Sequence, residues 1–479
     1  MNSSSSSSSS RTTEKKDKPT PVIDICRREV GRLSTRKFVH RLAASEDLVL
    51  RLDLARSLQK HIGCVNTVSF NVHGDILVSG SDDRRVVLWD WETGCVKLSF
   101  DSGHNNNIFQ AKIMPETDDR SIVTCAADGQ VRHATILECG KVETKLLGRH
   151  QGRAHRLANE PTNPHVFYTC GEDGLVQHFD LRTGGATELF TCQPVRGRIF
   201  TPVVHLNAIA IDPVNPNSFV IAGSDEFTRL YDIRRYRHDA SASFGKPVDH
   251  FCPEHLLHDE NVGITGVAFS DQSELLVSYT EEFIYLFSKD MGWGSDINSV
   301  LDDHILTVNS DSDMETDSKP GPQVFKGHRN CLTVKGVSFF GANEYVVSGS
   351  DCGRMFIWKK KDAKLIRVME ADKQVVNCIQ PHPHTLMLAS CGIDWDIKIW
   401  TPTALEKAPP PTNINRLRHA ANHWMVSPRD MALELLAMRS QRMSPLRGPN
   451  ENNEGDMMEF IVTFDAVSSD NEDQEASTG

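Results

Sequence analysis

The stretch LVSGSDDRRVVLWDWETG, from Leu77 to Gly94, decides the fold. An apolar run leads into an acidic turn, and a second apolar run then ends in Trp-Asp. This pattern is typical of two short β-strands joined by a tight turn. Weaker copies of the same phrase recur along the chain. Since one such unit cannot bury its apolar face alone, the copies must stack against one another.

Seven copies align on the residue that ends the second apolar run, and six of the seven residues there are aromatic. The aligned positions are Trp89, Ala134, Phe179, Tyr231, Phe287, Trp358 and Trp400. The residues six before them are mostly acidic: Asp83, Asp128, Asp173, Asp225, Glu281, Cys352 and Asp394. The residues ten before them are mostly hydroxylic: Ser79, Thr124, Thr169, Ile221, Val277, Ser348 and Ser390. Histidines recur further upstream, at His61, His104, His150, His205, His258 and His328.

The shortest spacings between these aligned positions, 42 to 45 residues, match the length of one four-stranded propeller blade. The phrases resemble WD40 repeats. We therefore predict an all-β fold, a seven-bladed WD40 β-propeller with short helical and disordered terminal extensions. In WD40 proteins a His, a hydroxyl, a carboxylate and an indole form a hydrogen-bonded chain in that order. We expect this structural tetrad in the first copy, from His61, Ser79, Asp83 and Trp89.

We expect the propeller to span residues 45–403, with 45–59 as its closing segment. The alternating run Glu46–Leu54 is the candidate strand, because the last copy ends at Trp400 and lacks an outer strand. Such a strand would join both ends of the ring and cover an open sheet edge. Two stretches are inserted. One, around 234–257, lengthens the link from the fourth to the fifth blade, and the acidic stretch 289–323 is expected to be a mobile loop.

The segments outside the ring are of three kinds. Residues 1–20 form a Ser-rich tail and residues 444–479 an acidic tail, both disordered by composition. Residues 21–44 are basic and amphipathic, which favours a helix. It either packs on the ring edge or docks into a partner's groove. A linker over 404–426 leads to a second predicted helix over 427–443, where Ser427 is the N-cap.

The composition argues against several classes of function. A net charge of −12 disfavours general nucleic-acid coating, because phosphate neutralisation requires a basic surface. The 12 cysteines contain no CxxC pair, and the N-terminus carries no apolar signal region, so we expect a protein of the nucleus and cytoplasm. We find no Gly-rich phosphate loop, HExxH or GxSxG. We therefore predict no catalytic residues, no metal, no cofactor and no membrane contact, and a rigid binding platform in place of an enzyme.

An asymmetry among the copies points to a binding site. Only the third and fourth copies continue as aromatic-Asp-x-Arg, in Phe179-Asp180-Leu181-Arg182 and in Tyr231-Asp232-Ile233-Arg234. Both arginines would project from equivalent turns of adjacent blades. Planar guanidinium groups suit carboxylate or carbonyl recognition on a partner. The alternative interpretation is that each Asp–Arg pair only braces its own turn and contacts no partner.

These two motifs resemble the signature of WD40 substrate receptors of cullin-4 RING ubiquitin ligases. Several phrases, among them HIGCVNTVSFN, SGSDDRRVVLWDW, FKGHRN, VVSGSDCGRMFIW and VVNCIQPHPH, are similar to the family of DDB1- and CUL4-associated factor 8, also called WD repeat protein 42A. The similarity spans about 60–403. One departure is that the motif aromatics here are Phe and Tyr in place of Trp.

The resemblance implies that the two motifs bind a DDB1-type adaptor, and through it a cullin-4 ligase. The implied adaptor-binding residues are Phe179, Asp180, Arg182, Tyr231, Asp232 and Arg234. Residues 21–44 would be the counterpart of a helical segment that also inserts into the adaptor, and the remaining surface would present an unidentified protein substrate. The alternative function is a ligase-independent scaffold for a chromatin or transport complex.

Overall fold

The computed structural model describes residues 21–161, 163–195, 202–235, 245–259, 261–308, 321–331 and 333–411. The chain divides into two compact units, residues 1–421 and 422–479, and all described residues belong to the first. Several sequence-based predictions lie outside the described residues: the tail 1–20, the linker beyond residue 411, the helix over 427–443 and the tail 444–479.

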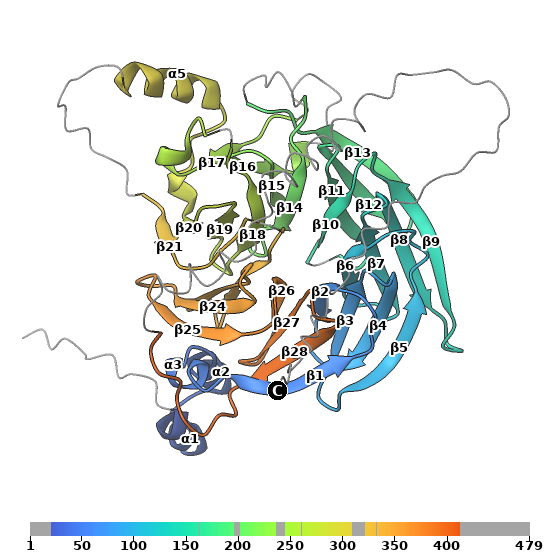
Figure 1. Ribbon diagram of the computed structural model, residues 1–479, viewed down its shortest axis with the longest axis vertical. Helices are drawn as coiled ribbons and strands as arrows, with labels where there is room; N and C mark the ends of the chain where they lie inside the picture. The colour runs from blue at the N-terminus through green and yellow to red at the C-terminus, as the bar shows by residue number, and fades with distance from the viewer. Residues whose placement is uncertain are drawn as a thin grey trace, which may run out of the picture. The chain divides into compact units, whose positions relative to one another are not determined.

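The described strands form seven antiparallel sheets of four strands each, placed around a common axis (Figure 1). In each blade the strands are given from the innermost outward. Blade 1 consists of β2 (Val65–Phe70), β3 (Ile76–Ser81), β4 (Arg85–Asp90) and β5 (Cys95–Asp101), and blade 2 consists of β6 (Ile108–Ile113), β7 (Ser121–Ala126), β8 (Gln130–Ile136) and β9 (Val142–Arg149). Blade 3 consists of β10 (Ala154–Asn159), β11 (Val166–Gly171), β12 (Leu175–Asp180) and β13 (Gly185–Thr191).

Blade 4 consists of β14 (Leu206–Ile211), β15 (Ser218–Gly223), β16 (Thr228–Asp232) and β17 (Asp249–Phe251), and blade 5 consists of β18 (Ile264–Phe269), β19 (Leu275–Tyr279), β20 (Ile284–Phe287) and β21 (Gln323–Phe325). Blade 6 consists of β22 (Val337–Phe340), β23 (Tyr345–Ser348), β24 (Arg354–Lys359) and β25 (Leu365–Glu370). Blade 7 is β26 (Val376–Pro381), β27 (Leu388–Gly392), β28 (Asp396–Thr401) and β1 (Asp53–Gln59). The seven-bladed β-propeller predicted from the repeats is thereby confirmed.

Blade 7 is completed by the N-terminal strand, which pairs antiparallel with β28 from Asp53 opposite Thr401 to Gln59 opposite Asp396. The strand lies later than the run 46–54 that we expected, because residues Glu46–Val49 form the short helix α3. Val49 and Leu52 are fully buried against blades 6 and 7. Their spacing of three positions puts both side chains on one side of a helical turn, whereas a strand would place them on opposite faces of the sheet.

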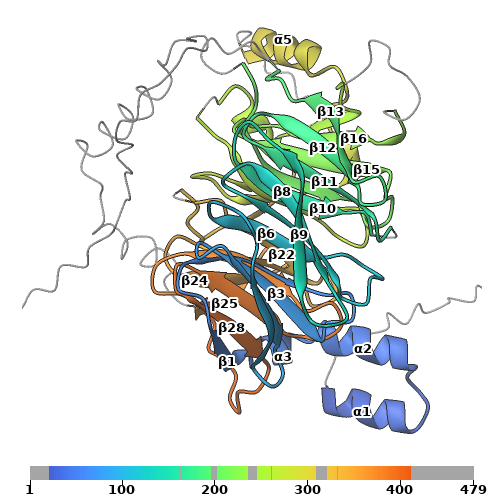
Figure 2. The ribbon, with the colours of Figure 1, turned by 90° about the vertical axis from the view of Figure 1, so that its right-hand side faces the viewer.

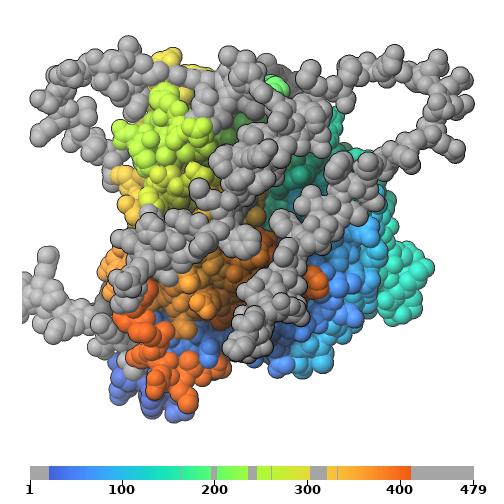
Figure 3. All heavy atoms as spheres, viewed as in Figure 1, coloured from blue at the N-terminus to red at the C-terminus, as the bar shows by residue number. Residues whose placement is uncertain are grey.

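The two ends of the ring lie side by side. The backbone N–H of Ala404 donates to the carbonyl oxygen of Arg51 at 3.1 Å, and that of Ala408 donates to the carbonyl of Leu50 at 2.9 Å. Figure 3 shows these last described residues, in orange, against the N-terminal segment in blue. The chain therefore leaves the ring next to the place where it entered.

The strand order defines two faces of the ring. Face A carries the turns from first to second strand and from third to fourth strand of each blade. Face B carries the turns from second to third strand and the links between blades, because alternate strands of an antiparallel sheet run in opposite directions.

Two helices precede the ring, α1 (Pro21–Glu29) and α2 (Thr35–Ala43), and they project from it as a helical hairpin (Figure 2). Ser34 is the N-cap of α2 and accepts the backbone N–H of Lys37 at 3.4 Å. The remaining described helices are η1 (Glu254–Leu256), η2 (Lys289–Met291) and α5 (Ile297–Val308). None of the described helices is long and apolar enough to cross a membrane.

Both insertions lie between a third and a fourth strand. We predicted that the first insertion lengthens the link between blades 4 and 5. Instead it contains β17, the outer strand of blade 4. The second is not a loop throughout, because η2 and α5 occupy its first half. Ile297 and Leu301 of α5 are buried in a core cluster, and their spacing of four residues favours a helix. Its acidic residues 309–320 lie outside the described residues.

The hydrophobic core is divided among the contacts between neighbouring blades. Each of the seven core clusters joins side chains of two adjacent blades, the seventh with the first included. No blade therefore buries its apolar faces alone, which is the behaviour expected of a closed repeat.

The predicted tetrad of blade 1 is present, but its order differs from the one we expected. His61 lies in the middle, with Nδ1 2.9 Å from Oδ2 of Asp83 and Nε2 2.8 Å from Oγ of Ser79. Nε1 of Trp89 donates to the same Ser79 hydroxyl at 2.9 Å. Asp83 stands in the turn after β3, next to the loop that carries His61, so the carboxylate meets the imidazole and not the indole.

The aligned aspartates divide into two groups by their partners. Blades 2 and 3 repeat the Asp–His–hydroxyl part in His104, Asp128 and Thr124 and in His150, Asp173 and Thr169. In blade 4, Asp225 pairs with Arg229 at 2.5 Å, and in blade 7, Asp394 pairs with Lys398 at 3.2 Å. A basic side chain four residues after the carboxylate there takes the place of the histidine.

Candidate protein-binding face

Blade 3 carries the first Asp–Arg turn directly after its third strand. β12 ends at Asp180, whose Oδ1 accepts the backbone N–H of Arg182 at 2.9 Å. The Arg182 guanidinium returns to the same carboxylate, with Nε 3.0 Å from Oδ1 and Nη2 2.7 Å from Oδ2. Two parallel charge-assisted hydrogen bonds therefore hold the guanidinium in one orientation.

Blade 4 repeats this arrangement. Oδ1 of Asp232 accepts the backbone N–H and Nε of Arg234, each at 3.0 Å, and Nη2 lies 2.5 Å from Oδ2. The two turns follow equivalent strands of adjacent blades, so both lie on face A. The Arg182 and Arg234 side chains are 61% and 64% exposed, which leaves them accessible to a partner.

The paired groups stay ionised. The hydrogen bond from Arg182 lowers the pKa of Asp180 to about 2, and the one from Arg234 lowers the pKa of Asp232. The same hydrogen bonds raise the pKa of each arginine. Each turn therefore presents a guanidinium that is charged and already oriented.

The brace and the docking interpretations are compatible in this geometry. Exposed ion pairs contribute little to stability, so the main effect of each pair is to fix the direction of the arginine. Nε and Nη2 are used by the carboxylate. Within the described residues, Nη1 of neither arginine makes a hydrogen bond. That edge of each group can donate to a carbonyl or carboxylate of a partner.

The aromatic members of the two motifs do not line the surface. Phe179 and Tyr231 are each 1% exposed, so these rings can support an adaptor contact only through the turns that follow them, and adaptor binding by the two motifs stays a prediction. Phe179 stacks on Phe167 with 4.8 Å between ring centroids, and Tyr231 stacks on Phe190 at 4.5 Å. The rings anchor the strands from which the Asp–Arg turns begin. The carboxylates of Asp180 and Asp232, 18% and 19% exposed, lie between these anchors and the arginines.

The helical hairpin is rooted on the same face. The hydroxyl of Tyr345, at the start of β23, donates to the carbonyl oxygen of Ala44 at 2.9 Å, one residue after α2 ends. Tyr345 follows the turn from first to second strand of blade 6, which lies on face A. The Asp–Arg turns and the root of the hairpin thus share one face of the ring.

The hairpin is held together from within. Nε of Arg41 in α2 lies 2.7 Å from Oδ2 of the buried Asp24 in α1. The guanidinium of Arg28 stands over the ring of Phe38, 4.9 Å from its centroid. A buried carboxylate at position 24 is not what the amphipathic pattern predicts, since Arg41 is its partner only in the folded hairpin.

These internal contacts turn apolar side chains outward. Five branched residues are 44% to 68% exposed: Val22, Ile23, Ile25, Val30 and Val39. Exposed apolar residues gathered on one short element mark an interaction surface. The amphipathic pattern of residues 21–44 predicts a helix but does not show which of its apolar side chains face outward. Nothing in the sequence shows that the interior of the hairpin is filled by Phe38 and an ion pair.

No group of three or more His, Cys, Asp or Glu side chains among the described residues is placed to hold a metal ion. Nε2 of His382 and Nε2 of His384 lie 2.9 Å from the carbonyl oxygens of Gly74 and Val72, respectively. These two imidazoles therefore fasten blade 7 to blade 1.

Comparison with known proteins agrees with the fold. The family described as WD domain, G-beta repeat, matches residues 52–90, 322–359 and 363–401. The first match begins close to β1 and reaches the end of β4, which fits a repeat that runs from the outer strand of one blade into the next.

Three relatives illustrate the similarity. The mouse protein DDB1- and CUL4-associated factor 6 is 31% identical over 55% of this chain and 31% of its own length. The Arabidopsis thaliana protein ALTERED SEED GERMINATION 2 is 34% identical over 53% of this chain and 37% of its own length. The human WD and tetratricopeptide repeats protein 1 is 24% identical over 79% of this chain and 89% of its own length.

The match thus spans about a third of the length of the first two relatives. The Asp–His–hydroxyl sets of blades 1 to 3, the closure by an N-terminal strand and the matched repeats agree with one another. This chain folds as a seven-bladed β-propeller that contains matches to the WD40 repeat, and it is similar at about 30% identity to DDB1- and CUL4-associated factor 6 and to ALTERED SEED GERMINATION 2.

Proposed function

We propose that this protein is the non-catalytic substrate-recognition subunit of a cullin-4–DDB1 ubiquitin ligase. The observation that carries the proposal is the pair of matching Asp–Arg turns on adjacent blades, with both arginines exposed on face A. The name of the similar factor 6 describes that protein as associated with DDB1 and CUL4. The finer assignment, to the group of factor 8, rests on the phrases shared along residues 60–403.

The proposed contact combines two kinds of interaction. Arg182 and Arg234 donate from Nη1 to oxygen atoms of the adaptor, and their orientation is fixed before the encounter. Less rotamer entropy is therefore lost on binding. The exposed Val and Ile side chains of α1 and α2 enter an apolar groove of the adaptor, in the manner of an amphipathic helix. A few such anchors can provide most of the binding energy.

The ring itself supplies proximity and no chemistry. With face A held by the adaptor, face B and the outer strands point away from it and are available to a protein substrate. The ligase then transfers ubiquitin from a conjugate bound elsewhere in the complex. The protein's part is to hold the substrate within reach, which converts an encounter between separate molecules into one within a complex.

The test is a double variant, Arg182→Ala with Arg234→Ala, compared with wild type for affinity to a DDB1-type adaptor by biolayer interferometry. Truncation of an interface arginine often costs about 1.4 kcal/mol or more of binding free energy. We therefore expect the affinity of the double variant to fall by about tenfold or more. The matched control is Arg84→Ala. Arg84 is an exposed arginine in a turn on face B, and its removal should leave affinity unchanged.

The melting temperature of each variant shows whether the ring remains folded. A folded double variant with wild-type affinity would remove the two arginines from the mechanism. Affinity purification of the wild-type chain separates the two functions considered above. A partner set without adaptor and cullin would favour the ligase-independent scaffold over the receptor.

A further inference from the structure

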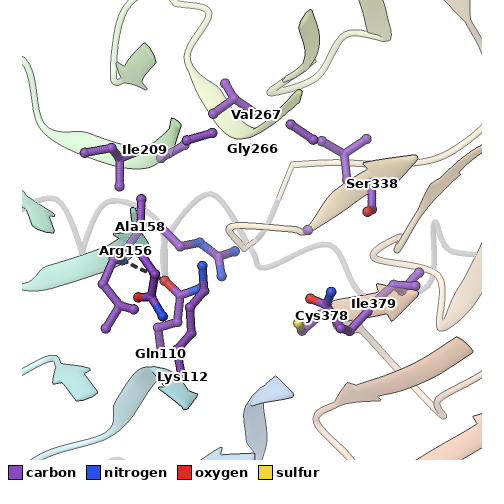
Figure 4. Close-up of a pocket in the computed structure, with 18 of the residues that line it drawn as sticks. Gln110, Lys112, Arg156, Ala158, Ile209, Gly266, Val267, Ser338, Cys378 and Ile379 are labelled. Atoms are coloured by element: carbon purple, nitrogen blue, oxygen red, sulfur yellow. Dashed lines mark hydrogen bonds between the residues drawn. The ribbon is translucent and has the colours of Figure 1, made fainter. Parts of the chain in front are cut away.

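The central channel of the ring has an unbalanced charge. A cavity of about 280 Å³ lies there, lined by residues of the innermost strand of every blade (Figure 4). Its lining contains two cationic side chains, Lys112 of β6 and Arg156 of β10, and no aspartate or glutamate. This contrasts with the whole chain, whose net charge is −12.

The positions of these cations follow from the repeat. In blades 2, 3, 4, 5 and 7 the third and fifth residues of the innermost strand line the cavity, and most of these side chains are small or neutral. Lys112 is the fifth residue of β6 and Arg156 is the third of β10, the same strand of the next blade. Blades 2 and 3 therefore contribute two positive charges to one side of an otherwise neutral channel.

A third polar group completes the cluster. Gln110, the third residue of β6, accepts the backbone N–H of Leu157 at 2.7 Å through its Oε1. This bond fixes the Gln110 amide between the two strands and leaves its NH₂ group as a donor. Figure 4 shows the side chains of Gln110, Lys112 and Arg156 directed toward the same part of the cavity.

The two cations have no counter-charge. In the described part of the chain, neither Lys112 nor Arg156 makes an ion pair or a side-chain hydrogen bond. Burial, and then the charge of Arg156, lower the pKa of Lys112 to about 8. Two like charges that face each other in a partly enclosed cavity repel one another more strongly than on the surface. An anion between them would remove this repulsion and satisfy their donors.

We propose that the central channel is a binding site for a small phosphate-bearing anion. The Arg156 guanidinium donates to two phosphate oxygens, the Lys112 ammonium to a third, and the Gln110 amide adds a further donor. Two positive charges match a phosphate dianion better than a single carboxylate. The cluster lies on the innermost strands, inside the ring, so the ligand is a free small molecule and not a peptide or a membrane.

Isothermal titration calorimetry of the full chain tests the site with two probes, inorganic phosphate and glycerol 3-phosphate, in a phosphate-free buffer at constant ionic strength. We expect one site per chain for at least one probe, and the stronger probe tells free phosphate from a phosphate ester. Arg156→Gln and Lys112→Met should each weaken binding by about tenfold or more. Arg149→Gln and Lys145→Met, exposed cations on the outer strand of blade 2, are the matched controls and should bind as wild type.

The melting temperature separates binding from a structural role. Without phosphate, Lys112→Met should melt at or above the wild-type temperature, because it removes one of two repelling charges. With phosphate, wild type should gain stability and Lys112→Met should not. Absence of saturable binding of either probe to wild type up to about 10 mM would overturn the proposal. Wild-type affinity in both channel variants would overturn it as well.

Discussion

At the scale of the residue, the buried hydroxyl groups of the repeat contribute to stability because they are hydrogen-bond partners of buried ring nitrogens. Ser79 serves both Nε2 of His61 and Nε1 of Trp89, and all three groups are buried. Replacing Ser79 by Ala would leave two buried ring nitrogens without this partner. An unsatisfied buried polar group costs about 1–3 kcal/mol, so the free energy of unfolding should fall by about 2 kcal/mol or more.

The equivalent hydroxyl of blade 2 provides the control. Thr124 serves only His104, because Ala134 stands where blade 1 has Trp89. Thr124→Val should therefore cost less than Ser79→Ala in urea-induced unfolding. An equal or larger loss in the blade 2 variant would contradict the shared role of Ser79.

Asp128 makes the stability of blade 2 dependent on pH. Burial alone would raise its pKa, but hydrogen bonds from His104 and from the backbone N–H groups of Asn105 and Gln130 outweigh burial and lower the pKa to about 2. A carboxylate with a lowered pKa stabilises the folded state above its unfolded pKa, near 3.8, and loses that contribution as pH falls toward 2.

The variant Asp128→Asn isolates this contribution. It should melt below wild type at pH 5 to 7, and the difference in melting temperature should shrink between about pH 4 and pH 2, where wild type becomes protonated. Thermal melts across this pH range measure it. A difference that is constant with pH would show that the charge of Asp128 does not stabilise the fold.

Many residue positions with a shared role could be predicted from the sequence, because aligned copies of the repeat reveal them. The tetrad members, and the equivalent places of Arg182 and Arg234, follow from alignment alone. The order within the tetrad does not, because it depends on which loop faces the carboxylate. Likewise, alignment places Phe179 and Tyr231 beside the arginines, but only packing shows that both rings are buried.

At the scale of the element, the N-terminal segment has two separable parts. α1 and α2 form a hairpin with its own internal contacts, whereas α3 and β1 belong to the ring. Removing residues 1–43, which keeps the Ala44 carbonyl that accepts the Tyr345 hydroxyl, should leave the melting temperature close to wild type but weaken adaptor binding, because the exposed apolar side chains are lost. Circular dichroism melts and the binding assay above measure the two effects separately.

Removing residues 1–59 is the matched comparison. It deletes β1, which leaves the edge of β28 open, and it removes the buried Val49, Leu52 and Leu58. Burial of each such side chain contributes about 1.5–3 kcal/mol, so this variant should lose several kcal/mol and aggregate through the open edge. A ring that melts and elutes as wild type without β1 would contradict the closure.

The elements also show where sequence patterns mislead. The run EDLVLRLDL can be taken for an alternating strand, yet Val49 and Leu52 pack in the same core cluster because they are three positions apart on a helical turn. In the stretch 289–323, acidic composition hides the apolar spacing of Ile297 and Leu301. Short runs allow both periods, and the neighbouring blades decide between them.

At the scale of the whole molecule, the ring places distinct chemistry in three regions. Face A carries the oriented arginines and the root of the apolar hairpin. The channel carries two cations without counter-charges. In the proposed function, face B is the region available to a substrate. The number of blades follows from counting copies, but the grouping on face A does not, because it joins blades 3 and 4 to a hairpin rooted on blade 6.

Hydrogen–deuterium exchange of the full chain, with and without a DDB1-type adaptor, tests the central claim most directly. Our account predicts slower exchange in the complex at the turns after β12 and β16 and across α1 and α2, with the turns of face B unchanged. Protection confined to face B, or no change at the Asp–Arg turns in a saturated complex, would contradict it.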